Sequence, residues 1–229
     1  MPSEMLRVGS ARLMSADVPR LPDADSDDFA PAVVIPKGAS FKDMIALKGK
    51  ADIHILVMTN GDKGCGNVEL CGNSTNAEIA QIREGEQFQS AAILGIPNEN
   101  VIFLGHEDCL LKTYPIAQIE QEVVGHVRRV KPHVVFTWDP AAKFEMISSQ
   151  GWGDMGYHPD HQASGQLALD SVWIAHLDRL WPELGAGWKV SELYFWAFTP
   201  ARVPDFYLDV TGAPYDTKTQ AFLAMQSQY

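Results

Sequence analysis

The chain has 229 residues, 46% of them hydrophobic, which is enough to bury the core of one domain. Its 29 acidic and 18 basic residues give a formal net charge of −11, which argues against nucleic acid or an anionic membrane surface as the main partner. No apolar run is long enough to span a bilayer, and the N-terminus lacks the apolar core of a secretory signal.

The three cysteines indicate a reducing compartment, so we expect a cytoplasmic protein. Cys65, Cys71 and Cys109 are an odd and sparse set, unlike the disulfide framework of a small secreted domain. The spacing of Cys65 and Cys71 is not one of the common zinc spacings. Free thiols are therefore expected at both positions.

The first 30 residues differ in character from the rest of the chain. They show little hydrophobic periodicity, and they carry the aspartates Asp17, Asp23, Asp25, Asp27 and Asp28. This composition predicts a disordered acidic segment at 1–30, followed by a single domain at 31–229.

From Asp52 onward, short β-branched runs alternate with longer helical ones. Strands are expected at 53–59, 101–104, 134–138 and 192–198. Helices are expected at 75–94, which opens with a capping-box sequence, at 115–130, and from Pro159 onward. The alternation predicts right-handed βαβ units and an α/β fold of the Rossmann-like kind: a doubly wound, mainly parallel sheet with helices on both faces.

Polar residues directly follow three of the predicted strands. They occupy 60–64, 105–108 and 139–140. Each segment alone also fits an ordinary turn, because Asn, Gly and Asp are turn formers. In an open parallel sheet, however, ligands bind outside the carboxyl ends of the strands, so the three segments together favour a site.

The segment 157–161 sets two imidazoles around a carboxylate at a helix entrance. Pro159 suits the first helical position, and Asp160 adds favourable negative charge in the first turn. His158 and His161 lie about one turn apart and are expected to face one cavity that holds a metal, with Asp160 available to accept a ring N–H. Surface or capping histidines without chemical consequence are the alternative. The apolar stripe of the helix is expected to comprise Leu167, Leu169, Val172, Trp173, Leu177 and Leu180.

Several segments, in this order, resemble the LmbE-like or PIG-L-like family of N-acetylglucosamine deacetylases. They are 59–64, 82–84, 103–105 with Asp108, 158–161, and a weaker match at 223–228. The resemblance implies a Rossmann-like fold and a metal-dependent hydrolase, usually with zinc, that removes an acyl group from an amino sugar or a similar amide. The substrate is then a small molecule, and homo-oligomer formation stays open.

The resemblance also implies roles for individual residues. It makes His161 a metal ligand, and it makes His158 the group that stabilises the oxyanion or protonates the leaving amine, with Asp160 orienting His158. The expected substrate contacts are Arg83, Asp108 and Asp62. For Arg83, a solvated ion pair with Glu84 is the alternative.

The other half of the family's site is altered in this chain. Family members carry His-Pro-Asp-Asp just after an N-terminal strand, for two metal ligands and the general base, whereas no histidine precedes His54 here. An ungapped match on Asp28 puts Asp23 at a metal-ligand position and Asp25 at the general base. A gapped match instead aligns residues 22–23 with the Pro-Asp of the motif. Neither match restores the motif, and the preceding segment lacks a β-branched strand.

Two functions follow from these observations. The first is a zinc-dependent deacetylase-type hydrolase, and the alternative is a catalytically inactive, sugar-binding pseudoenzyme. A nucleotide-binding Rossmann domain is not favoured, because no Gly-x-Gly-x-x-Gly follows a strand. The altered N-terminal half fits a repurposed site, a loss of catalysis, or chain ends that are incomplete relative to the family.

Overall fold

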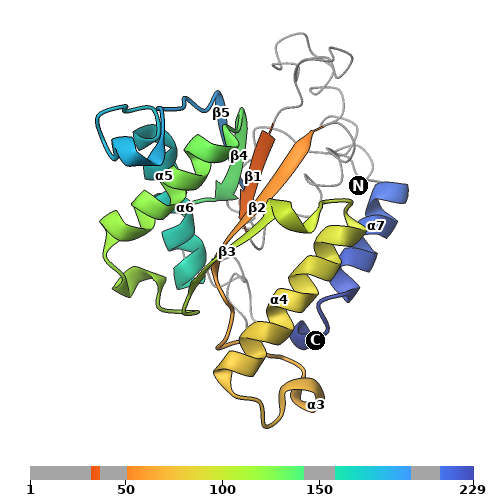
Figure 1. The fold of residues 1–229 in the computed structure, drawn as a ribbon. Helices are drawn as coiled ribbons and strands as arrows, with labels where there is room; N and C mark the ends of the chain where they lie inside the picture. The colour runs from red at the N-terminus through yellow and green to blue at the C-terminus, as the bar shows by residue number, and fades with distance from the viewer. Residues whose placement is uncertain (1–31, 37–50, 142–157, 197–211) are drawn as a thin grey trace.

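A five-stranded parallel sheet forms the centre of the molecule (Figure 1). The computed structural model describes residues 32–36, 51–141, 158–196 and 212–229. The strands are β1 (Ala32–Pro36), β2 (Asp52–Thr59), β3 (Val101–His106), β4 (Val134–Trp138) and β5 (Glu192–Trp196). Every pair of neighbouring strands is parallel, which confirms the predicted Rossmann-like class.

The strand order is β3-β2-β1-β4-β5, the order of a doubly wound sheet. Val33 of β1 pairs with Ile53 of β2 on one side and with Val134 of β4 on the other. The sheet grows in opposite directions from β1, so the switch point lies between the carboxyl ends of β1 and β4. Ligands of such sheets bind at this point.

β1 was not predicted from the sequence. Its run Ala-Val-Val-Ile-Pro has only five residues, too few to show a periodicity, and it follows the aspartate-rich segment. Its place at the centre of the sheet comes from pairing with β2 and β4, which are distant in sequence. A central strand therefore precedes β2, although none was expected there from the sequence.

The described residues form four longer helices, of which the first three were predicted from the sequence and the last was not. They are α4 (Asn76–Ile93), α5 (Ile116–Val130), α6 (Pro159–Ile174) and α7 (Ala213–Leu223), with a short α3 (Val68–Cys71). Single 3-10 turns are η1 (Asn98–Asn100), η2 (Leu111–Thr113), η3 (Pro182–Leu184) and η4 (Gln226–Gln228). The predicted capping box opens α4: Thr75 accepts from the Glu78 backbone N–H, and the Glu78 carboxylate accepts from that of Thr75.

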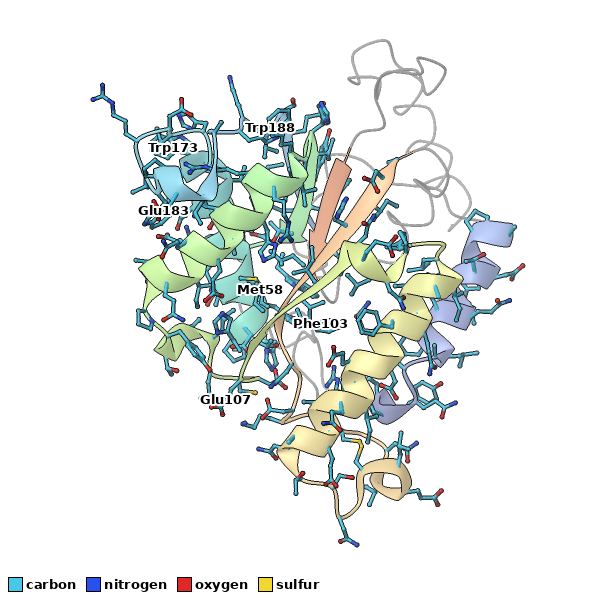
Figure 2. The ribbon with its side chains drawn as sticks, viewed as in Figure 1. Met58, Phe103, Glu107, Trp173, Glu183 and Trp188 are labelled. Atoms are coloured by element: carbon cyan, nitrogen blue, oxygen red, sulfur yellow. A yellow bond between two sulfur atoms is a disulfide. The ribbon has the colours of Figure 1, made fainter. Side chains whose placement is uncertain are left out.

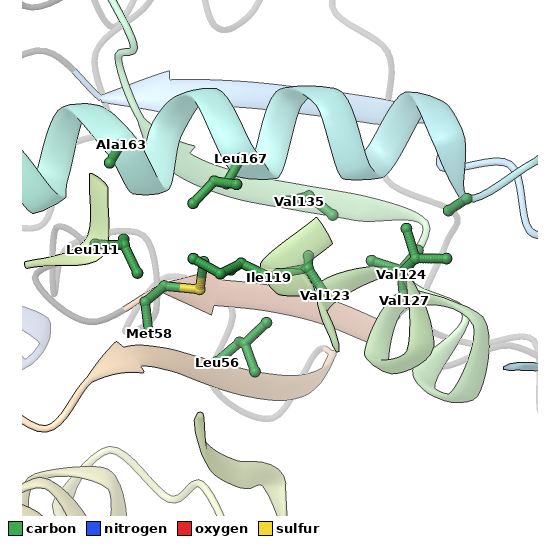
Figure 3. Close-up of a cluster of buried hydrophobic side chains, with 11 residues drawn as sticks. Leu56, Met58, Leu111, Ile119, Val123, Val124, Val127, Val135, Ala163 and Leu167 are labelled. Atoms are coloured by element: carbon green, nitrogen blue, oxygen red, sulfur yellow. The ribbon is translucent and has the colours of Figure 1, made fainter. Parts of the chain in front are cut away.

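Two hydrophobic cores lie on opposite faces of the sheet. In β2, Ile53, Ile55 and Val57 pack with residues of α4 and α7, whereas Leu56 and Met58 pack with α5 and α6 (Figure 3). This alternation is the two-residue period of a strand covered on both sides. Complete burial of a side chain such as Ile55 contributes roughly 1.5–3 kcal/mol. Figure 1 shows the two helix layers flanking the sheet.

A buried cation anchors the end of α6 to α5. Arg128 is only 2% exposed, and its guanidinium donates to main-chain carbonyl groups just after α6. The acceptors are Ala175, Leu177, Leu180, Trp181 and Gly185, at 2.7–3.3 Å. These hydrogen bonds give the N–H donors of the buried guanidinium their partners, and they fix the position of α6 against α5.

Part of the predicted apolar stripe of α6 was wrong. The helix ends at Ile174, so Leu177 and Leu180 lie beyond it, and Trp173 is 64% exposed (Figure 2). Leu167 of the predicted stripe is buried, and so are small residues such as Ala163 and Ser164. Because small side chains face the sheet, α6 lies close to the backbone of β4.

The expectation of free thiols at Cys65 and Cys71 was also wrong. The two residues form a disulfide, visible beside α3 in Figure 2. The turn of α3 brings their Cα atoms to 6.4 Å, within the range that a disulfide spans. The reducing compartment was inferred because three cysteines are an odd and sparse set, and the disulfide weakens this inference.

Candidate active site

Polar side chains from three connections meet at the carboxyl edge of the sheet. The connections are the loop after β2, the loop after β3 and the entrance of α6. The cluster, called the site below, comprises Asp62, Asp108, Cys109, His158, Asp160 and His161. The structure thus brings together predicted residues from the loop after β2, the loop after β3 and the histidine segment, and adds Cys109; the predicted segment 139–140 contributes none of them.

His158 is the N-cap of α6. Its Nδ1 accepts the Asp160 backbone N–H at 3.2 Å. A neutral ring whose Nδ1 accepts must carry its proton on Nε2. Nε2 lies 3.5 Å from Sγ of Cys109, so this N–H points into the site.

Asp160 joins α6 to the loop after β3. Its carboxylate is buried and accepts the backbone N–H groups of Cys109 at 2.6 Å and Leu111 at 3.1 Å. Burial raises the pKa of Asp160, against the lowering effect of these two hydrogen bonds. The Asp160 backbone N–H donates to His158, whereas the prediction was that the Asp160 carboxylate accepts a ring N–H.

His161 stacks on Trp138, with the ring centroids 3.9 Å apart and the planes within 5°. Its ring centroid is 4.9 Å from that of His158. Burial, together with the nearby His158, lowers the pKa of His161 to about 4, so the ring is neutral at pH 7. Its Nδ1 is buried and has no hydrogen-bond partner among the described residues. A neutral imidazole with an unused, buried nitrogen fits a metal ligand.

Asp62 connects the loop after β2 to the loop after β3. Its buried carboxylate accepts the Asp108 backbone N–H at 2.9 Å and pairs with Lys63, which also reaches Glu107 at 3.0 Å. Burial alone raises the pKa of Asp62, but Lys63 and the Asp108 N–H outweigh it, and the net shift is downward. The described contacts of Asp62 thus connect two loops of the protein.

Arg83 of α4 donates hydrogen bonds to the loop after β2. Its Nη1 donates to the carbonyls of Gly61 at 3.3 Å and Gly64 at 2.8 Å. Gly61 has φ +67°, and a Cβ there would lie 2.9 Å from the guanidinium. The described hydrogen bonds of Arg83 therefore support the loop, and none of the ion pairs in the described residues joins it to Glu84.

A contact between the C-terminal segment and the same loop was not predicted from the sequence. The buried Glu86 carboxylate accepts the Ser227 backbone N–H at 2.7 Å and its hydroxyl at 2.6 Å. The Ser227 carbonyl accepts from the backbone N–H groups of Gly66 at 2.7 Å and Asn67 at 3.2 Å. The only sequence signal was the weak match at 223–228.

Cys109 was also missed, because it was considered only as a thiol in the cysteine count. It is exposed and follows Asp108 with a left-handed backbone, φ +66°. Asp108, Cys109 and His158 each offer a ligand atom within 4.8 Å of the others, a possible metal-binding group.

The remaining predicted residues, Asp23 and Asp25, lie outside the described residues. Both precede β1 in the sequence, whereas the family motif is expected after the N-terminal strand. The prediction that Asp23 binds metal and that Asp25 acts as the base is untested.

The polar residue that follows β4 behaves as a turn former. Asp139 is buried, and its carboxylate accepts the Ala141 backbone N–H at 2.9 Å. This contact is that of an Asx turn, which was the plain alternative for this segment.

Comparisons with known proteins identify the family of the chain. Residues 39–172 match the family described as PIG-L, GlcNAc-PI de-N-acetylase. The diacetylchitobiose deacetylase of Thermococcus kodakarensis is 25% identical over 179 residues, covering 78% of this chain and 60% of that protein. The 1D-myo-inositol 2-acetamido-2-deoxy-alpha-D-glucopyranoside deacetylase of Rhodococcus opacus is 27% identical over 173 residues, covering 66% of this chain and 53% of that protein.

A solved structure supports the fold. The N,N'-diacetylchitobiose deacetylase from Pyrococcus horikoshii matches with a TM-score of 0.72 and 19% identity, over 100% of this chain and 80% of that one. The chain spans 60% and 53% of the two sequence relatives. The family match covers more than half of the chain and includes the loop after β2, the loop after β3 and the histidine-bearing entrance of α6. The chain therefore belongs to the PIG-L family.

Proposed function

We propose that this protein is a metal-dependent deacetylase that hydrolyses the amide of an N-acetylglucosamine conjugate or a similar small molecule. The observation that carries the proposal is the pair of imidazoles at the entrance of α6. One ring directs an N–H into the site, and the other keeps a buried nitrogen unused. Two sequence relatives of the chain are named as deacetylases of acetamido sugars.

Zinc is the proposed metal, with His161 as one ligand. Zinc binds neutral imidazole together with carboxylate or thiolate ligands. Asp23 is proposed as a further ligand and Asp25 as the general base. When bound, the metal would polarise the amide carbonyl and lower the pKa of its water.

His158 is proposed to stabilise the oxyanion of the tetrahedral intermediate. Its Nε2–H is held in place because the Asp160 backbone N–H occupies Nδ1. A donor fixed in advance stabilises developing negative charge without reorganising. Protonation of the leaving amine by this neutral ring would leave an imidazolate, so the described tautomer favours the first of the two predicted roles.

The sugar is proposed to bind over the loops after β2 and β3. Asp108 is half-buried and lies beside Gly64, with its Oδ2 3.7 Å from the position of a Cβ there. Its carboxylate is the proposed acceptor for sugar hydroxyl groups. Arg83 and Asp62 are proposed to act on the substrate by holding these loops in position.

The test compares zinc-loaded wild-type protein with three variants. The substrates are N-acetylglucosamine conjugates, including diacetylchitobiose, and the released amine is measured. His158→Gln should keep its metal and lose about 10²–10³-fold in turnover, the scale of one oxyanion donor. His161→Ala should lose metal and activity together. His176→Ala removes an exposed ring just after α6 and is the matched control. No amine above the His161→Ala background would overturn the proposal.

The pseudoenzyme remains the second candidate, because no histidine precedes His54. Sugar binding measured by calorimetry without amine release, in protein that holds no stoichiometric zinc, would favour it. A homo-oligomer and the absence of nucleic-acid partners also stay predictions, open to sizing and to binding assays.

We also propose a cytoplasmic location, against which the Cys65–Cys71 disulfide weighs, because disulfides are rare in the cytosol. None of the helices in the described ranges is long and apolar enough to cross a bilayer. Counting the free thiols of protein trapped by alkylation in the cell tests the location: three are expected in the cytosol, and one where the disulfide forms.

A further inference from the structure

We infer that Asp108, Cys109 and His158 form a second cation site, beside the proposed His161 site, that takes a thiophilic divalent cation such as zinc or cadmium. Its effect on turnover rests on the proposed function: a cation at this site inhibits the enzyme. The three side chains offer a carboxylate oxygen, a sulfur and an imidazole nitrogen, all within 4.8 Å of one another. Three protein ligands with an open fourth position are a recurrent zinc arrangement.

The spacing of the two softer ligands matches a tetrahedral cation. Zinc binds sulfur at about 2.3 Å and imidazole nitrogen at about 2.0 Å, so the two ligand atoms of a tetrahedral site lie about 3.5 Å apart. Cys109 Sγ and His158 Nε2 are separated by 3.5 Å. The pair can therefore bind one ion with little movement of either side chain.

The backbone fixes these ligands before any cation arrives. The Cys109 backbone N–H donates to the Asp160 carboxylate at 2.6 Å and to Oδ1 of Asp108 at 3.1 Å. The Asp108 backbone N–H is held by Asp62 at 2.9 Å. His158 is fixed as the cap of α6. Cys109 is exposed, so a cation reaches the thiol directly from solvent.

Filling this site moves two protons. The thiol of Cys109 gives its proton to solvent when sulfur binds the cation, and the ring proton of His158 moves from Nε2 to Nδ1. One proton is released for each cation bound. Protonated Nδ1 can no longer accept the Asp160 backbone N–H. Cation binding therefore breaks the side-chain hydrogen bond with which His158 caps α6.

Because of this cost, the second site should fill only when the cation is abundant. Once filled, Nε2 of His158 is a ligand and can no longer donate to an oxyanion. An excess of zinc should therefore inhibit an enzyme that needs zinc at the His161 site.

Cobalt absorption tests the site without any activity measurement. The titration uses protein in which the Cys65–Cys71 disulfide is formed, so that Cys109 is the one free thiol among the chain's three cysteines. A thiolate-to-cobalt charge-transfer band then reports Cys109 alone. Metal-free wild-type protein and His161→Ala should both give the band on titration with Co²⁺. Cys109→Ser should lose it, and His158→Gln should need at least tenfold more cobalt.

Blocking the thiol of folded wild-type protein with iodoacetamide should also remove the band, which covers the case of a misfolded Cys109→Ser. The absence of the band in unblocked wild-type protein overturns the inference. So does its persistence in Cys109→Ser, or its loss in His161→Ala, since the thiol would then belong to the first site.

The activity assay tests the inhibition separately. Wild-type turnover should fall between one and many equivalents of zinc, and Cys109→Ser should need at least tenfold more zinc for the same fractional loss. Equal zinc sensitivity of the two proteins refutes the inhibition. A protein that gives the cobalt band but releases no amine refutes the proposed function, while the second site stands.

Discussion

Replacing His161 by glutamine should change how the stability of the metal-free protein depends on pH. Burial, with a smaller contribution from His158, lowers the pKa of His161 from an ordinary 6.5 to about 4 in the folded state. Above pH 6.5 the ring is neutral in both states, and it adds no pH dependence. Between pH 6.5 and 4 the unfolded chain binds a proton that the folded protein does not, so stability falls as the pH falls.

The size of the effect follows from proton linkage. One proton taken up only by the unfolded state changes the unfolding free energy by about 1.4 kcal/mol per pH unit. From pH 6.5 to pH 5, His161 should therefore cost roughly 2 kcal/mol. The loss should level off near pH 4, where the folded protein also binds the proton.

Urea unfolding with a chelator present, at pH 7 and at pH 5, measures the difference. The wild-type protein should lose about 2 kcal/mol more than His161→Gln between these two values. His126→Gln is the matched comparison, because burial and then Arg129 lower the pKa of His126 to about 4 as well. Equal losses in wild type and His161→Gln would refute the reasoning that the ring is buried and neutral.

Three further substitutions test the supports of the site by urea unfolding. Gly165→Ala should cost about 2 kcal/mol or more and lower turnover, because its Cβ would lie 2.4 Å from the Trp138 carbonyl and push α6 away. Arg128→Lys should cost roughly 3 kcal/mol, since an ammonium cannot reach all the carbonyls that the guanidinium serves. Ser227→Ala should cost roughly 2 kcal/mol, because it removes the hydroxyl that donates to the Glu86 carboxylate. Unchanged stability in any of these three variants would contradict the role given to that residue.

Local signals explain what the sequence predicted well. The capping box at Thr75 and Glu78 and the proline at the start of α6 act within a single turn, so they are readable without knowledge of the fold. The apolar run of β4 was predicted at both ends, because a strand covered on both faces is apolar throughout.

The missed features depend on contacts between distant parts of the chain. β1 becomes the central strand only through partners on both sides. The Cys65–Cys71 bond requires the turn of α3 between the two residues. Ser227 lies 141 residues from Glu86, and nothing near either residue in the sequence indicates that they meet.

The same distinction applies to the active site. The imidazole pair was predictable because His158 and His161 share one helix turn. Another member of the donor group, Cys109, lies 49 residues before His158 and meets it because β3 ends, and α6 begins, at the same edge of the sheet. A cysteine count could not indicate this proximity.

The described half of the site holds itself together. Arg83 holds the loop after β2, Asp62 joins that loop to the loop after β3, and Asp160 joins the latter to α6. Each link connects a side chain to backbone N–H or carbonyl groups, so it constrains the course of the chain rather than one rotamer. None of these three links involves a residue of the segment that was matched to the His-Pro-Asp-Asp motif. An alteration of that motif can therefore change the metal ligands and the base while the imidazoles keep their positions, and for this reason the metal and cobalt measurements decide more about function than the fold does.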